Sequence, residues 1–428
     1  MNDDRLPSSP FASALSPSPV APPSRAAVVL ALAMGLAPAL SLSSALAMAP
    51  LLALTAVAML AANGWRRPAP VPTRAQGLLL LALLAWAAWS TGWSLDQAFA
   101  WRDIGMLIGT LLGGVVVQAE ARRLDEAGLA LVVRALSIGL LVVVPAMVLC
   151  GGLEQMHVLD TETTQKVIEA VVQRMNRGST VCVMLMWVAA LGQVRFGRPW
   201  RAVGLVLVLL LGVTFTHDLA AKLAIVGGAG VWAAARLSPR FAAAGLAALI
   251  LAVMLLAPLA ALHMPPPRQS IYISWLPRSG HHRMTIWSFT AQRIAEKPLL
   301  GWGMDSSRAI PGAKDEIYLI DRAGKLFNES MLPLHPHNGP LQIWLELGGI
   351  GASLMALFLL TLPYSLARGS APPTVKAFGA AMLFGGFLIA SVSYGVWQSW
   401  WLSTVWLAVA GLGAMSRGPA VKSSPAAL

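Results

Sequence analysis

Long apolar runs dominate this sequence and restrict it to a membrane protein. Twelve runs have the length of a membrane-spanning helix, and short polar segments separate them. Hydrophobic residues make up 57% of the 428-residue chain and charged residues only 12%, which is not typical of a soluble protein of this size. The sequence therefore predicts an all-α integral membrane protein with about twelve transmembrane helices. The expected helices cover residues 26–44, 46–63, 75–94, 104–120, 127–151, 178–194, 200–216, 219–236, 241–262, 341–364, 376–394 and 399–415.

The positive charge of the chain follows the predicted topology. The net charge is +12, but basic residues gather in alternate loops, as the positive-inside rule describes for cytoplasmic loops. We therefore expect cytoplasmic termini, and no nucleic acid is needed to explain the charge. The two cysteines, Cys150 and Cys182, provide neither a disulfide framework nor the spacing of a metal site. The basic clusters are Arg66, Arg67 and Arg74; Arg122 and Arg123; Arg195, Arg198 and Arg201; Arg236 and Arg240; Arg368 and Lys376; and Arg417 and Lys422.

Two polar segments are expected on the outer, periplasmic face. The shorter covers residues 152–177, and the longer covers 263–340, far longer than an ordinary connection and therefore a candidate for function. The longer loop holds nine Lys or Arg and six Asp or Glu residues, a net charge of +3. The positive-inside rule places excess basic residues in cytoplasmic loops, so a net positive charge on an outer loop needs another cause. Anion binding is the simplest such cause. The predicted organisation is a disordered cytoplasmic tail (1–25), nine transmembrane helices (26–262), the long outer loop (263–340), three further helices (341–415) and a cytoplasmic tail (416–428).

Within the long loop, residues 283–297 predict a short amphipathic helix that ends at Pro298. The apolar turn that follows, residues 299–303, is expected to rest on the membrane surface.

The end of the long loop contains the most informative residue, His337. It directly precedes a predicted transmembrane helix in which Pro340 suits the first turn, with Asn338 or Gly339 as the cap. A titratable imidazole is thus expected at the boundary between water and lipid. Such a position suits a substrate that has one lipid end and one polar end.

Several motifs in this loop occur in a characteristic order. They are Arg283…Trp287…Pro298-Leu-Leu-Gly301-Trp302-Gly303 and His337-Asn338-x-x-Leu341-Gln342-x-x-x-Glu346-x-Gly348-x-x-Gly351. With these motifs, the sequence resembles the bacterial O-antigen ligase and polymerase group, polytopic glycosyltransferases that use polyprenyl-diphosphate glycans. A further element, residues 175–179, resembles the Asn-Arg-Gly element of these proteins. One departure is at residues 216–222, where family members often carry a Ser-Arg-Gly segment and this chain has Lys222 near the arginine position.

The resemblance and the chemistry of the residues predict a metal-free transferase. Guanidinium groups can bind and neutralise a departing diphosphate, and histidine has the pKa best suited to accept a hydroxyl proton at working pH. We therefore expect His337 as catalytic base, with no metal and no cofactor. The acidic pair Asp315–Glu316 does not share one face and is not expected to bind metal. Expected diphosphate ligands are Arg283, Arg177, Lys222, Arg174 and Arg278, and expected supporting residues are Asn338, Gln342, Glu346 and His335.

Each of these residues also has a structural explanation. His337 could cap a helix, and Arg283 could pair with Glu296 or Glu329. Arg177 and Lys222 could extend to the interface from helix ends. Glu346 lies on the helical face of Gln342 and could instead be neutralised by a cation.

The predicted function is that of an O-antigen ligase with a GT-C-like fold in the bacterial inner membrane. It would transfer a glycan from undecaprenyl diphosphate to a hydroxyl of lipid A–core oligosaccharide on the periplasmic face, with inversion. Expected partners are these two glycolipids and membrane lipids, with the protein a monomer or weak dimer. Alternatives are an O-antigen polymerase, a protein O-oligosaccharyltransferase and, in a different class, a polyprenyl-linked glycan transporter.

Overall fold

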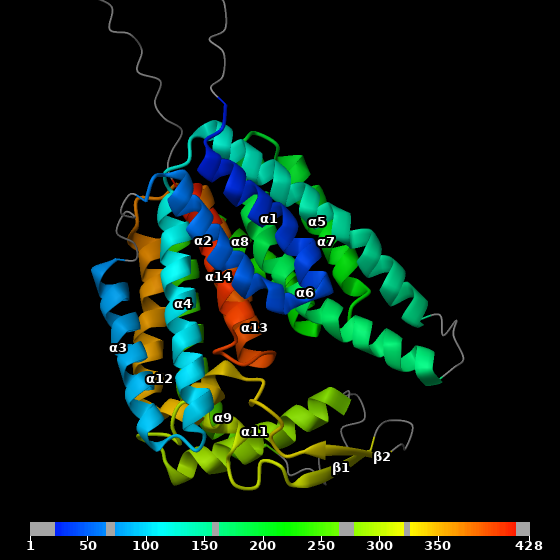
Figure 1. Ribbon diagram of the computed structural model, residues 1–428, viewed down its shortest axis with the longest axis vertical. Coiled ribbons are helices and arrows are strands. Elements are labelled where there is room, and N and C mark those ends of the chain that lie inside the picture. Colours follow the sequence, from blue (N-terminus) through cyan, green and yellow to red (C-terminus); the bar gives the residue numbers. More distant parts are fainter. Residues whose placement is uncertain (1–21, 66–72, 156–161, 265–277, 321–325, 417–428) are drawn as a thin grey trace, which may run out of the picture.

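The computed structural model describes residues 22–65, 73–155, 162–264, 278–320 and 326–416. Most of the two expected tails, 1–25 and 416–428, lies outside these ranges. The described chain is almost entirely helical (Figure 1), which confirms an all-α polytopic membrane protein.

Each predicted apolar run coincides with a helix. Ten of the described helical segments are long and apolar enough to cross a membrane, and α7 and α14 are shorter apolar helices. The number of helices that cross the membrane stays a prediction. The helices are α1 (Arg25–Ser43), α2 (Met48–Ala62), α3 (Arg74–Ser90), α4 (Gln97–Ala121), α5 (Glu126–Gln155), α6 (Glu162–Arg195), α7 (Pro199–Thr214), α8 (Leu219–Leu237), α9 (Pro239–Leu262), α12 (Gly339–Arg368), α13 (Pro373–Val392) and α14 (Ser399–Ala414).

Helix α6 runs through the centre of the bundle. Its apolar window, within residues 173–195, is 89% buried, and it contacts α1, α5, α7, α13 and α14. The helix begins earlier than the apolar run predicts, because the polar residues 162–177 continue it; Glu, Gln, Lys and Arg are all good helix formers. Residues that were expected in an outer loop, Arg177 among them, therefore lie on a helix that reaches the core.

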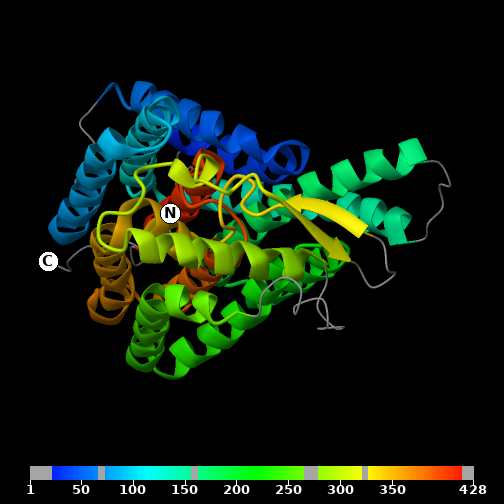
Figure 2. The ribbon, with the colours of Figure 1, turned by 90° about the horizontal axis from the view of Figure 1, so that it is seen from below.

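The long loop forms a layer across one end of the bundle. Helix α11 (Arg278–Glu296) lies across the helix ends (Figure 2), whereas α1 begins and α14 ends at the opposite end (Figure 1). Helix α11 starts five residues before the predicted one and ends at Glu296. It buries Ile286, Phe289 and Ile294 in a cluster with Leu341 and Leu345 of α12. The layer is thus part of the folded core and fixes the residues that enter α12.

A β-hairpin in this layer was not predicted. Strand β1 (Glu316–Ile320) pairs antiparallel with β2 (Leu326–Ser330), with Tyr318 opposite Asn328. It is connected to α11 through the ring of His282, whose Nε2 lies 2.9 Å from the carbonyl oxygen of Ser330.

The segment after α11 inserts at a break in α12. At Gly348 the backbone turns to φ 64° and ψ −168°, which frees carbonyl and N–H groups of the helix. The N–H groups of Trp302 and Gly303 donate to the carbonyls of Leu345 and Glu346 at 2.8 and 2.9 Å, and Gly349 N–H donates to Pro298 O at 2.8 Å. These bonds satisfy the backbone groups that the break leaves without partners in the helix.

The expected membrane-surface turn at 299–303 is therefore wrong for its second half. Trp302 is buried, and its indole N–H donates to the Arg293 carbonyl oxygen at 2.8 Å. Leu299 and Leu300 remain exposed. The free backbone groups of α12 explain why the turn packs inward.

Candidate functional site

The two histidines of the loop form a tight pair just before α12. Their ring centroids are 4.3 Å apart, and the backbone N–H of His337 donates to Nδ1 of His335 at 3.2 Å. The intervening Pro336 carbonyl accepts from the indole of Trp287 at 2.9 Å. His337 has φ 54°, a left-handed conformation that is uncommon outside glycine and is found at functional sites.

The hydrogen bond of His337 defines its tautomer. Nδ1 lies 2.6 Å from the carbonyl oxygen of Ser393, in the connection between α13 and α14. A carbonyl oxygen only accepts, so Nδ1 of the neutral ring carries the proton and Nε2 keeps its lone pair. His337 therefore presents an unprotonated nitrogen, as a general base requires.

The surroundings of both histidines favour their neutral form. Burial lowers the pKa of His337 below its ordinary value, the Ser393 carbonyl opposes this, and the charges of Arg283, His282 and Arg177 lower the pKa further. Burial lowers the pKa of His335 to about 3, with further lowering by His337, Arg308 and Arg177. Both rings are consequently neutral at pH 7.

The charges of two arginines from distant parts of the chain act on the histidines. Arg283 lies on α11 and is half-buried, whereas Arg177 lies on α6 and is exposed. Among the described residues, neither side chain forms an ion pair or a hydrogen bond. Both guanidinium groups are thus available to a bound anion beside the base.

A buried polar network supports the arginine side of the site. Asp218, the N-cap of α8, accepts hydrogen bonds from Ser179 and Thr180 at 3.0 and 2.7 Å and from Ala221 N–H at 3.0 Å. Burial raises the pKa of Asp218, while these hydrogen bonds and then the charge of Arg283 lower it. The hydroxyl of Tyr394 donates to the carbonyl oxygen of Asn176 at 3.2 Å.

The predicted supporting residues connect α12 to the α13–α14 connection. Asn338 caps α12 by accepting from Leu341 N–H at 3.0 Å, and Pro340 lies in the first turn, so both of these expectations are confirmed. Gln342 accepts from Val396 N–H at 2.9 Å and donates to Glu346 at 3.1 Å. This pairing places the connection, and with it the Ser393 carbonyl, against His337.

Glu346 is satisfied by neutral donors. Its carboxylate accepts from the Trp397 indole at 2.6 Å, from Asp305 N–H at 3.2 Å and from the Ser307 hydroxyl. No cation pairs with it among the described residues. Glu346 therefore joins α12, the α13–α14 connection and the segment around Asp305.

The structure does not bring every predicted cation to the histidines. Lys222 is half-buried one turn beyond Asp218, and Arg174 is exposed on α6; neither contributes to the charge effects on His335 or His337. The side chain of Arg278 lies outside the described residues. The diphosphate roles of all three stay predictions.

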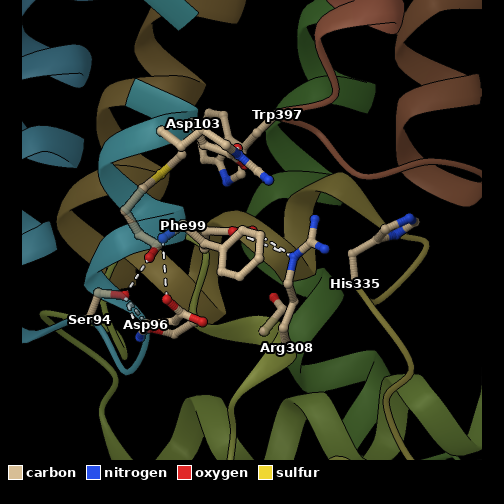
Figure 3. Close-up of polar contacts among 12 residues, drawn as sticks. Ser94, Asp96, Phe99, Asp103, Arg308, His335 and Trp397 are labelled. Carbon is tan, nitrogen blue, oxygen red and sulfur yellow. Dashed lines mark hydrogen bonds and ion pairs between the residues drawn. The ribbon is translucent and has the colours of Figure 1, made fainter. Parts of the chain in front are cut away.

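Sequence reasoning missed the residues of the α13–α14 connection. Ser393 contacts His337 through its backbone carbonyl, and Tyr394 and Trp397 contact residues of helices that are distant in the sequence. No local sequence pattern therefore identifies these three residues. Their aromatic and polar side chains between two apolar runs were the one available signal. Arg308, which the sequence did not distinguish from ordinary surface charge, lies next to His335 (Figure 3).

Part of the chain is similar to known polysaccharide ligases. Residues 204–356, which include Arg283 and His337, match the family model described as O-antigen ligase. Proteins named as candidate polysaccharide ligases in Rickettsia conorii, Rickettsia typhi and Rickettsia bellii are 32, 32 and 33% identical over 239, 240 and 239 residues. Each match covers 55% of this chain and 56–57% of the relative, so the chain spans a little more than half the length of the curated relatives it matches. The matches confirm the predicted resemblance: the chain is O-antigen ligase-like.

Proposed function

We propose that the protein is an O-antigen ligase, which transfers O-antigen polysaccharide from undecaprenyl diphosphate to a hydroxyl of lipid A–core oligosaccharide. The observation that carries this proposal is the neutral His337, whose Nε2 has no hydrogen-bond partner among the described residues and whose pKa is lowered by the charges of Arg283 and Arg177. The match of residues 204–356 to the O-antigen ligase family supports the same assignment.

In the proposed reaction, His337 Nε2 accepts the proton of the acceptor hydroxyl as its oxygen attacks the anomeric carbon. The bond from that carbon to the diphosphate oxygen breaks, and the electron pair leaves with the diphosphate. Arg283 and Arg177 bind its oxygens and neutralise the charge that develops on them. A single displacement of this kind inverts the anomeric centre and has no step that needs a metal.

The proposed location is the bacterial inner membrane. The layer built from α11 and the hairpin would face the periplasm, with both termini in the cytoplasm. The basic loops at the opposite end of the bundle support this orientation. Membrane lipids would surround a monomer or weak dimer.

An O-antigen polymerase and a protein O-oligosaccharyltransferase would use the same donor and the same base. The relatives in Rickettsia are named as candidate polysaccharide ligases, which favours a glycan acceptor over a protein. A transporter would form no new bond between the glycan and an acceptor, and this outcome separates it from the ligase in the assay below.

A transfer assay tests the proposal directly. Purified protein, an undecaprenyl-diphosphate glycan and lipid A–core are incubated with EDTA and without an ion gradient. We expect glycosylated lipid A–core, detected as a ladder on a gel, at the same rate with and without EDTA. Product that requires a divalent ion would refute the metal-free mechanism, and product only on a peptide or a second lipid-linked glycan would move the function to one of the alternatives.

The pH dependence of glycan transfer should follow the ionisation of the His337 imidazole. Because the imidazole must be neutral to accept a proton and its pKa is lowered, the acidic limb of kcat/KM is expected below pH 6.5. Replacing Arg283 by Gln removes a charge that lowers this pKa, so the limb should move to higher pH. Arg283→Lys keeps the charge and should keep the limb in place. A limb above pH 7 in the wild type would exclude a neutral, buried His337 as the base.

A further inference from the structure

The side of the site beyond His335 has a different composition from the Arg177–Arg283 side. Phe99 and Arg102, in the first turns of α4, meet Arg308 of the short helix η3 (Ser306–Arg308). The guanidinium of Arg102 lies 4.5 Å from the Phe99 ring centroid, and that of Arg308 lies 5.5 Å from it. In Figure 3, Arg308 lies between Phe99 and His335.

Arg308 is held by one edge only. Its Nε lies 3.4 Å from Oδ2 of Asp305. Among the described residues, its two Nη groups have no hydrogen-bond partner, and 37% of its side chain is exposed. The terminal fork of the guanidinium is therefore open to a ligand.

The segment that carries Arg308 is fixed to α12, to α3 and to the connection between α3 and α4. Asp305 is 3% exposed, has φ 53°, and donates its N–H to Glu346 of α12. The Ser94 hydroxyl, between α3 and α4, donates to Met304 O at 2.7 Å, and the Ser90 hydroxyl of α3 accepts from Met304 N–H at 3.1 Å. This anchoring sets the position of Arg308 before any ligand arrives.

The charges of this side balance. Arg102 donates to Asp103 at 2.9 and 3.1 Å, and Arg308 pairs with Asp305. Burial, followed by the charge of Asp103, raises the pKa of Asp305 to about 6, so its carboxylate is ionised at pH 7. Two cations thus face two anions, whereas the diphosphate side has two arginines and the single carboxylate of Asp218.

We infer that Phe99, Arg102, Asp103 and Arg308 form a subsite for the sugar ring of the acceptor. Guanidinium groups donate to hydroxyls, the carboxylate accepts from them, and the exposed side chain of Phe99 offers an apolar contact to the C–H groups of the sugar ring. A balanced set of this kind suits a neutral, hydroxyl-bearing ligand, while the cationic side suits the donor diphosphate. The acceptor hydroxyl would then reach His337 from the side of His335. This inference rests on the proposed function.

Steady-state kinetics with both substrates test the subsite. Arg308→Gln and Phe99→Ala are compared with the wild type, varying the acceptor at saturating donor and then the donor at saturating acceptor. We expect the acceptor KM to rise about tenfold or more in Arg308→Gln, as for one lost hydrogen bond to a charged group, with the donor KM unchanged. Phe99→Ala, at an exposed position of another helix, should raise the acceptor KM in the same direction without affecting folding.

The matched control is Arg368→Gln at the end of α12. Arg368 also lies near an aromatic ring, 5.9 Å from the Tyr364 centroid, but outside the site, and both KM values should stay at wild-type levels. An unchanged acceptor KM in both site variants, or an equal rise of donor and acceptor KM, would overturn the subsite while leaving the ligase intact. A wild type that transfers no glycan would overturn the proposed function and the subsite together.

Discussion

Replacing His337 by alanine is expected to lower kcat for glycan transfer by about 10²–10⁴-fold, the usual effect of losing a general base. The variant should still bind the donor, because Arg283 and Arg177 remain in place. The value of kcat should fall because the Ser393 carbonyl accepts a hydrogen bond from Nδ1–H of His337, so Nε2 is the atom that accepts the hydroxyl proton. Single-turnover transfer to lipid A–core measures the effect apart from product release.

A second histidine provides the control for this variant. The ring of His263 also bonds a backbone carbonyl, that of Leu259 at 2.8 Å, but it is exposed at the end of α9. His263→Ala should transfer at the wild-type rate. If His337→Ala keeps wild-type kcat while its thermal stability is unchanged, the ring has only a structural role and another base must be sought.

The helices could be predicted from the sequence because few backbone structures other than a helix can cross a bilayer. Each apolar run must satisfy its own backbone groups, so a run of sufficient length predicts a helix with little influence from its neighbours. The cap at Asn338 and the pairing of Gln342 with Glu346 were predictable for a similar reason, since both depend on residues three or four positions apart.

What the sequence did not predict depends on long-range contacts. The Ser393 carbonyl is 56 residues from His337, and a carbonyl has no signature in the sequence. Arg308 could not be distinguished from ordinary loop charge until Asp305, Phe99 and His335 were seen around it. The inward packing of residues 301–303 depends on the break in α12, and a Gly-Gly pair in an apolar run does not by itself predict a break.

Replacing Gly348 by alanine is expected to destabilise the protein by about 3 kcal/mol or more, the range of forbidden backbone geometry combined with a core clash. At φ 64° and ψ −168° the position suits only glycine, and an added Cβ would lie 2.2 Å from the carbonyl oxygen of Leu299. Gly301, with φ 71°, faces the same junction, so the backbone on the other side cannot move away freely. Thermal unfolding in detergent, followed by loss of monodisperse protein, should show a clear fall in melting temperature.

A second glycine variant controls for the general effect of replacing glycine by alanine in a helix. Gly245 lies within α9, and an added Cβ there would meet nothing within 4 Å, so Gly245→Ala should leave the melting temperature unchanged or raise it slightly. The junction should also affect acceptor binding, because the segment inserted at Gly348 continues into Asp305 and Arg308. Gly348→Ala should therefore raise the acceptor KM at temperatures where the protein is still folded. A variant with wild-type stability and wild-type acceptor KM would mean that α12 can close across this position, and that the inserted segment does not depend on the break.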